Sequence, residues 1–170
     1  MKKKWLLAPM AAVLLLTACG ETEIEKVDTA KSVTKKDAAA KKKDEVFKVG
    51  DTVKVNGVEI TINKAEFTKP AQYSEAKNGS VLTLDVALKN TNEDSAFVDN
   101  TEFQLYDKGD NQMEDYFGYD DLAISKDLNA GKKATGKLYF DVKKGKSYEL
   151  IYEPTFTLDN KEIKWNIKVN

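Results

Sequence analysis

Apolar and polar residues alternate with a period of two in six stretches of this chain, and this alternation constrains its fold more than any other feature. The stretches are residues 58–62, 82–88, 103–105, 138–142, 148–152 and 163–169. Strands with this pattern bury one face and expose the other, which is typical of antiparallel sheets. Asn56 and Gly57 stand between two apolar-alternating runs, which is a strong signal for a hairpin. The pattern predicts an all-β fold, an immunoglobulin-like antiparallel β-sandwich over residues 46–170.

The two sheets of this sandwich must be joined by apolar packing, because a chain with one Cys cannot form an internal disulfide. Trp165, Phe103 and Phe140 lie on the apolar faces of the predicted strands and are the main core candidates. Helical periodicity is not sustained anywhere in this region, and at most a turn fits between residues 115 and 125.

The residue types present exclude several classes of function. The 170 residues include no His, and all 27 basic residues are Lys. A Cys/His zinc site, a His-activated nucleophile and a guanidinium clamp on phosphate are therefore excluded. Residues 46–170 hold 17 Lys against 21 acidic residues, so we expect no binding of nucleic acid. Paired carboxylates could hydrolyse a glycosidic bond, but no pair stands out, and we expect that the protein is not an enzyme.

The N-terminus has the features of a secretory signal. Lys residues at positions 2–4 precede an apolar run over residues 5–16, which is too short to span a bilayer. The run ends in Leu16-Thr17-Ala18-Cys19, which resembles the lipobox of bacterial lipoproteins. The resemblance implies that residues 1–18 are removed and that Cys19 receives a diacylglyceryl group, a palmitate-type anchor on the extracytoplasmic face of the cell membrane. The alternative is an ordinary signal peptide that contains a Cys.

Residues 19–45 have the composition of a charged, flexible tether. Residues 20–45 contain seven Lys, seven acidic residues and no aromatic residue. The large apolar side chains of Ile24, Val27 and Val33 are too sparse to build a core, so we expect most of this segment to stay disordered and to lift the domain clear of the lipid. The alternative is that its Lys runs lie on an anionic membrane surface.

Three stretches of the domain, residues 46–53, 82–92 and 128–142, resemble a family of immunoglobulin-like domains found on secreted and lipid-anchored proteins of Gram-positive bacteria. That family is structurally similar to a mycobacterial secreted immunoprotective antigen. The resemblance covers nearly all of residues 46–170 and implies a sandwich fold in an extracytoplasmic place. The biochemical role of the family is mostly unassigned, so the resemblance implies no site residue.

The long connection over residues 107–133 is the segment least like a core, and loops of this length are often functional. It carries Tyr116, Phe117 and Tyr119, and a second connection over residues 68–80 carries Tyr73. Aromatic residues on loops are favoured at protein interfaces, and nearby acidic residues would steer a basic partner. We therefore expect a non-catalytic binding or adaptor role at the cell envelope, through loops at one end of the sandwich. The oligomeric state and a purely structural spacer role stay open.

The same connection offers an alternative, a module that binds calcium or another small ligand. Ca²⁺ prefers oxygen ligands in a flexible cage. The candidate ligands are Asp107, Asp110, Glu114, Asp115, Asp120 and Asp121. Their spacing does not match an EF-hand loop, and we expect no other cofactor.

Overall fold

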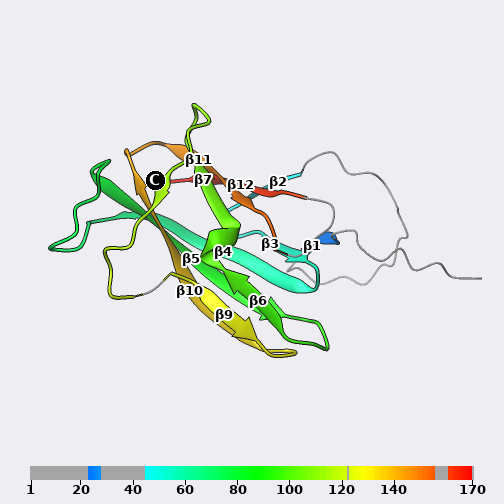
Figure 1. Ribbon diagram of the computed structural model, residues 1–170. Helices are drawn as coiled ribbons and strands as arrows, with labels where there is room; N and C mark the ends of the chain where they lie inside the picture. Colours follow the sequence, from blue (N-terminus) through cyan, green and yellow to red (C-terminus); the bar gives the residue numbers. More distant parts are fainter. Residues whose placement is uncertain (1–22, 28–44, 122, 156–160, 170) are drawn as a thin grey trace, which may run out of the picture.

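The computed structural model describes residues 23–27, 45–121, 123–155 and 161–169 (Figure 1). The elements are β1 (Ile24–Val27), β2 (Val46–Lys48), β3 (Thr52–Val55), β4 (Val58–Thr68), β5 (Ser80–Asn90), β6 (Ala96–Asp99), the 3₁₀ helix η1 (Asn100–Glu102), β7 (Phe103–Tyr106), β8 (Glu114–Asp115), β9 (Ser125–Leu128), β10 (Lys133–Val142), β11 (Ser147–Tyr152) and β12 (Ile163–Lys168). The predicted all-β class is confirmed, and each of the six alternating stretches contains strand.

The strands form two main sheets. One has the order β1-β3-β4-β5-β10-β8, and the other has the order β2-β12-β11-β7, while β6 and β9 pair separately. All pairs are antiparallel except β2 with β12. Strands β4, β5, β10 and β8 follow the A-B-E-D order of an immunoglobulin constant-type sheet, and β12, β11 and β7 follow G-F-C. The immunoglobulin-like β-sandwich is therefore confirmed at the level of strand order.

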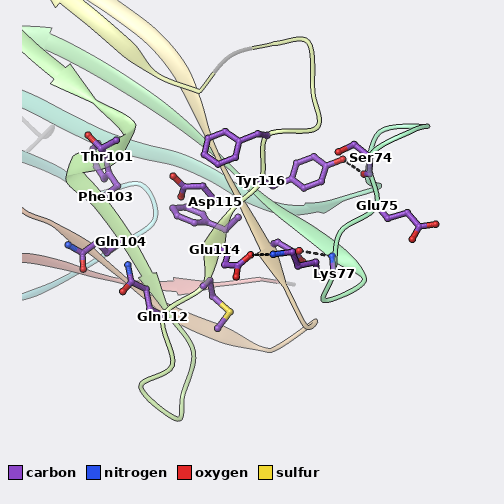
Figure 2. Close-up of a pocket in the computed structure, with 14 residues that line it drawn as sticks. Ser74, Glu75, Lys77, Thr101, Phe103, Gln104, Gln112, Glu114, Asp115 and Tyr116 are labelled. Carbon is purple, nitrogen blue, oxygen red and sulfur yellow. Dashed lines mark hydrogen bonds and ion pairs between the residues drawn. The ribbon is translucent and has the colours of Figure 1, made fainter.

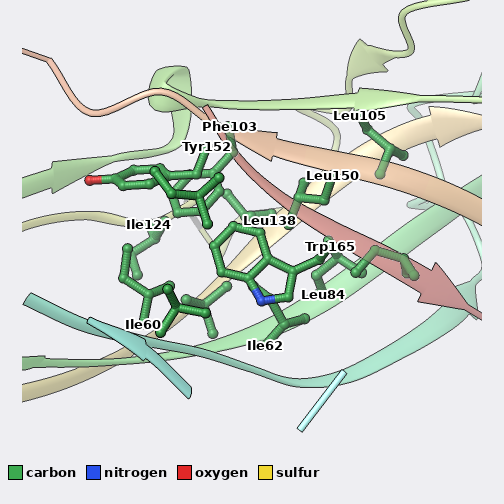
Figure 3. Close-up of a cluster of buried hydrophobic side chains, with 14 of the residues drawn as sticks. Ile60, Ile62, Leu84, Phe103, Leu105, Ile124, Leu138, Leu150, Tyr152 and Trp165 are labelled. Atoms are coloured by element: carbon green, nitrogen blue, oxygen red, sulfur yellow. The ribbon is translucent and has the colours of Figure 1, made fainter. Parts of the chain in front are cut away.

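The core lies between the two sheets and is filled mostly by the residues that the alternation predicted (Figure 3). Trp165, Phe140 and Phe103 are 0%, 1% and 3% exposed, which confirms the three core candidates. The indole N–H of Trp165 has no hydrogen-bond partner in the described part of the chain, so this side chain contributes through packing alone. The Phe103 and Tyr152 rings lie 4.6 Å apart between their centroids.

The hairpin expected at Asn56 and Gly57 joins β3 to β4. Both residues have positive φ angles, 48° and 79°, as a two-residue hairpin turn with right-handed strand twist requires. The amide of Asn92 lies where a side chain at position 57 would begin, so only Gly fits there. The antiparallel pairing of β4 with β5 places Asn90, at the end of β5, beside Val58, which follows this turn.

A hydrogen-bonded tyrosine closes the corner between β10 and β11. The Tyr148 hydroxyl donates to the carbonyl of Lys143 at 2.5 Å and accepts from the backbone N–H of Gly145 at 2.7 Å. This arrangement is the tyrosine corner of immunoglobulin-like domains. In antibody domains, a Cys stands two residues after this Tyr. Leu150 occupies that later position and is fully buried, so packing replaces the disulfide.

Strand β1 lies within the segment that was expected to be a tether. It pairs with β3 in the register Ile24↔Val55 to Val27↔Thr52, and Ile24 packs against the core. The expectation of a flexible tether over residues 19–45 is therefore wrong for residues 24–27. The predicted signal peptide, Cys19 and residues 28–44 lie outside the described residues.

The connection over residues 107–133 contains more regular structure than expected. Strand β8 adds to the edge of the larger sheet, and β9 pairs with β6. The connection is therefore two short strands joined by loops, one of which, residues 116–121, reaches the end of the sandwich where residues 69–79 join β4 to β5.

Candidate functional site

The connection between β4 and β5 is held to the sheet by a buried carboxylate. Asp141, on β10, is 4% exposed and accepts hydrogen bonds from the backbone nitrogens of Lys77 at 2.6 Å and Asn78 at 2.9 Å. Hydrogen bonds to an ionised acceptor are stronger than those between neutral groups. The strand pairing places Asp141 opposite Val81, directly beside this turn.

Tyr116 ties the same connection to the segment after β8. Its ring is 6% exposed, and its hydroxyl accepts from the backbone N–H of Ala71 at 2.7 Å and donates to the carbonyl of Ser74 at 2.6 Å (Figure 2). Gly118 passes so close to Tyr116 and Ser74 that a β-carbon there would overlap both side chains. The two loops are thus packed together as one unit.

Tyr119 and Tyr139 extend this packing over the outer face of the sheet. Their rings lie 4.9 Å apart between centroids, and the Tyr119 hydroxyl donates to the carbonyl of Lys69 at 2.6 Å. The Tyr139 hydroxyl donates to the Asp121 carboxylate at 3.0 Å. Burial, together with the neighbouring Asp121 charge, raises the pKa of Tyr139 well above its usual value.

The four aromatic residues expected to contact a partner divide into two pairs. Tyr116 and Tyr119 support the loops from inside, because Tyr116 is buried and Tyr119 is only partly exposed. Tyr73 and Phe117 are 93% and 80% exposed. Sequence reasoning could not separate the pairs, because burial depends on which residues of the other loop each ring meets.

A groove of about 930 Å³ opens beside these loops, between the edge strands β7 and β8 (Figure 2). Its apolar lining comes from Phe103, Met113, Phe117 and Phe140. Ser74, Glu75, Lys77, Thr101, Gln104, Gln112, Glu114 and Asp115 are among the polar residues that line it. The groove was not predicted, because its walls come from both sheets and a loop.

The residues that line the groove carry more negative than positive charge. The Lys77 ammonium lies 2.6 Å from the Glu114 carboxylate, so these two charges largely cancel. In the described part of the chain, neither Glu75 nor Asp115 forms an ion pair. Asp115 accepts a hydrogen bond from the Asn100 side chain at 3.2 Å, and burial raises the pKa of its carboxyl group despite this bond.

The six carboxylates considered as calcium ligands do not converge. Asp107 accepts from the backbone nitrogens of Gly109 and Asn111 within its own turn, and hydrogen bonds lower the pKa of its carboxyl group. Asp110 and Asp120 are exposed. Glu114, Asp115 and Asp121 have the separate partners described above. Across residues 23–27, 45–121, 123–155 and 161–169, no three His, Cys, Asp or Glu side chains gather as a metal site.

Residues 47–163 match a family described as a domain of unknown function, DUF4352. The chain belongs to the DUF4352 family. Within the described residues, no helix is both long enough and apolar enough to cross a membrane.

Two relatives of this DUF4352 protein come from Bacillus subtilis. The chain is 35% identical over 144 residues to the uncharacterized lipoprotein YcdA, covering 76% of this chain and 39% of YcdA. It is 30% identical over 132 residues to the uncharacterized lipoprotein YjhA, covering 67% of this chain and 62% of YjhA. The chain therefore spans less than two thirds of either relative. These matches confirm the family resemblance, and neither name states an activity or a ligand.

Solved structures of the same proteins share the fold of this DUF4352 domain. The crystal structure of YcdA matches with a TM-score of 0.57 over 65% of this chain and 36% of that chain. The crystal structure of YjhA matches with a TM-score of 0.55 and 24% sequence identity, over 74% of this chain and 100% of that chain. The secreted protein MPT63 of Mycobacterium tuberculosis matches with a TM-score of 0.48 at 13% identity, over 69% of this chain and 83% of that chain.

Proposed function

We propose that this protein is a lipid-anchored, extracytoplasmic binding module that contacts a partner at the cell envelope through the loop end of its sandwich. The lipobox-like sequence ending in Cys19 supports the anchor, and the names of two relatives as lipoproteins support it independently. The binding role rests on the geometry of residues 69–79 and 116–121.

The observation that carries the proposal is the exposure of Tyr73 and Phe117 on loops whose backbone is pinned. Both rings are almost fully exposed, while Asp141 and Tyr116 hold the adjacent chain in place. Large aromatic side chains supply much of the energy of protein interfaces, and a backbone ordered in advance loses less entropy on binding. This arrangement favours a binding surface over a plain spacer.

The groove beside these residues suggests the chemistry of the partner. Its apolar lining offers a place for an apolar side chain, and Glu75 and Asp115 leave an excess of negative charge among its lining residues. Complementary charge favours a partner segment that carries Lys or Arg.

Photocrosslinking in cells tests the proposal directly. A photoreactive residue replaces Tyr73 or Phe117 in the full chain, and a third protein carries it at the exposed Glu93, which follows β5 at the opposite end of the sandwich. We expect one envelope protein to be captured from both loop positions and not from position 93. Equal capture from all three positions, or no adduct at either loop position, would overturn the proposed binding end.

A further inference from the structure

Strand β1 is fastened to the sandwich by several independent contacts. The backbone N–H of Glu23 donates to the Asn56 side chain at 3.1 Å, and the backbone N–H of Asn56 donates to the Glu23 carbonyl at 3.0 Å. The Lys26 ammonium lies 3.2 Å from the Asp51 carboxylate, and Ile24 packs against the core. The strand is thus an edge of the larger sheet, held along its whole length by β3.

This attachment leaves a short covalent link to the proposed anchor. Cys19 precedes Glu23 by four residues, and an extended chain spans at most about 3.6 Å per residue, or roughly 14 Å in total. A free segment of 26 residues would instead reach roughly 25–30 Å as a random coil. Residues 28–44 follow β1 in the chain, so they do not separate Cys19 from the first strand of the sandwich.

The contacts of Glu23 also identify the end of the sandwich from which the anchor leaves. Asn56 lies in the β3–β4 turn, and its carbonyl accepts from the Asn92 side chain just after β5 at 2.9 Å. From this turn β4 runs eleven residues to Thr68, a length of about 33 Å at 3.3 Å per step. Figure 1 shows β1 at one end of β4 and the connection to β5 at the other.

We infer that the Asn56–Asn92 end of the sandwich faces the lipid head groups and that the Tyr73–Phe117 end points away from the membrane. This inference rests on the lipid anchor of the proposed function and adds the orientation of the anchored domain. The surface that meets the membrane comprises the β3–β4 turn and residues 91–95. The binding end stands about 33 Å farther out, where it meets proteins of the envelope and not the bilayer surface.

Energy transfer to a labelled membrane tests the orientation. The thiol of Cys19 is consumed by the lipid, so Glu93→Cys or Gln72→Cys supplies the single site for a donor dye on the full lipidated chain. Both positions are exposed and lie at opposite ends of the sandwich. In vesicles that contain an acceptor lipid, we expect severalfold greater transfer from position 93 than from position 72. Equal transfer, or greater transfer from position 72, would overturn the inference.

Two further proteins separate the orientation from the anchor itself. The double substitution Ile24→Asp and Val27→Asp removes the apolar contacts of β1, and we expect transfer from position 93 to fall because 26 residues then separate Cys19 from β2. The exposed substitution Glu25→Gln is the matched control and should preserve the difference between positions. Cosedimentation with vesicles reports the anchor, and we expect the Cys19→Ser protein to lose it. If the parent chain does not cosediment, both the anchor and the orientation are wrong. If the parent chain cosediments but energy transfer from positions 93 and 72 is equal, the orientation alone is wrong.

Discussion

The carboxylate of Asp141 lies 2.6 Å from the backbone nitrogen of Lys77, a residue 64 positions earlier in the chain. Burying this carboxylate without its hydrogen bonds from the backbone of Lys77 and Asn78 would cost free energy. Without the carboxylate, these two backbone N–H groups would lose their acceptor. The position of the connection that carries the exposed ring of Tyr73 therefore depends on the buried carboxylate of Asp141.

Replacing this carboxylate should loosen the loop that it holds. Asp141→Asn keeps the shape but removes the charge and one acceptor oxygen, so we expect a loss of about 1–3 kcal/mol in the free energy of unfolding. Urea denaturation measures this loss, and hydrogen exchange should show faster exchange at residues 76–79. Asp127→Asn, at an exposed position on β9, is the matched control. A loss no larger than that of the control would contradict the role of Asp141.

The close approach of the two loops at Gly118 can be tested by adding one methyl group. Gly118→Ala should cost about 1–3 kcal/mol, because the β-carbon would overlap the Tyr116 and Ser74 side chains. Tyr116→Ala removes both Tyr116 atoms that the added carbon would overlap, the hydroxyl oxygen and the ring carbon that carries it. A double-mutant cycle with both substitutions should therefore be non-additive, and additive costs would show that the loops do not meet there.

Stability should fall steeply in alkaline solution. Burial raises the pKa of Tyr139, Tyr148 and Tyr152, and the nearby Glu102 charge raises that of Tyr152 further. Because the folded pKa values exceed the unfolded value of about 10, the unfolded chain loses protons first, and the stabilisation present below pH 10 disappears as the pH rises. Urea midpoints between pH 8 and 11 measure the fall, and tyrosinate absorbance should rise together with unfolding. Ionisation of these tyrosines near pH 10 without loss of structure would contradict the prediction.

Removing the exposed aromatic rings should abolish binding without affecting the fold. We expect Tyr73→Ser with Phe117→Ser to keep the melting temperature of the parent protein, since both rings are almost fully exposed. Capture of the partner by a crosslinker elsewhere on the loop end should be lost. Phe97→Ser is the matched control, because this ring is 54% exposed on β6, outside the loop end. Capture that survives the double substitution would exclude these rings as contacts.

Adding Ca²⁺ tests the alternative function, a module that binds calcium. Because Asp107, Glu114 and Asp121 have different protein partners, we expect no rise in melting temperature when Ca²⁺ is added. A thermal scan with and without Ca²⁺ is sufficient. A rise that disappears in the protein with Asp120→Asn and Asp121→Asn would restore the calcium hypothesis.

The alternation of residues by itself determined the class of fold and most of the core. Side chains on a strand point to opposite faces in turn, so Trp165, Phe103 and Phe140 could be assigned to the interior without knowing their neighbours. The turn at Asn56 and Gly57 was equally predictable, because positive φ angles are a local requirement.

The tertiary structure alone decided the features on which function rests. Ile24 joins the sheet because β3 offers it a free edge, which no local pattern in a charged segment reveals. Tyr116 is buried and Phe117 is exposed because one ring meets Ser74 and Ala71 from a distant connection and the other does not. Such contacts join residues that are far apart in the chain, and a pattern read along the chain carries no information about them.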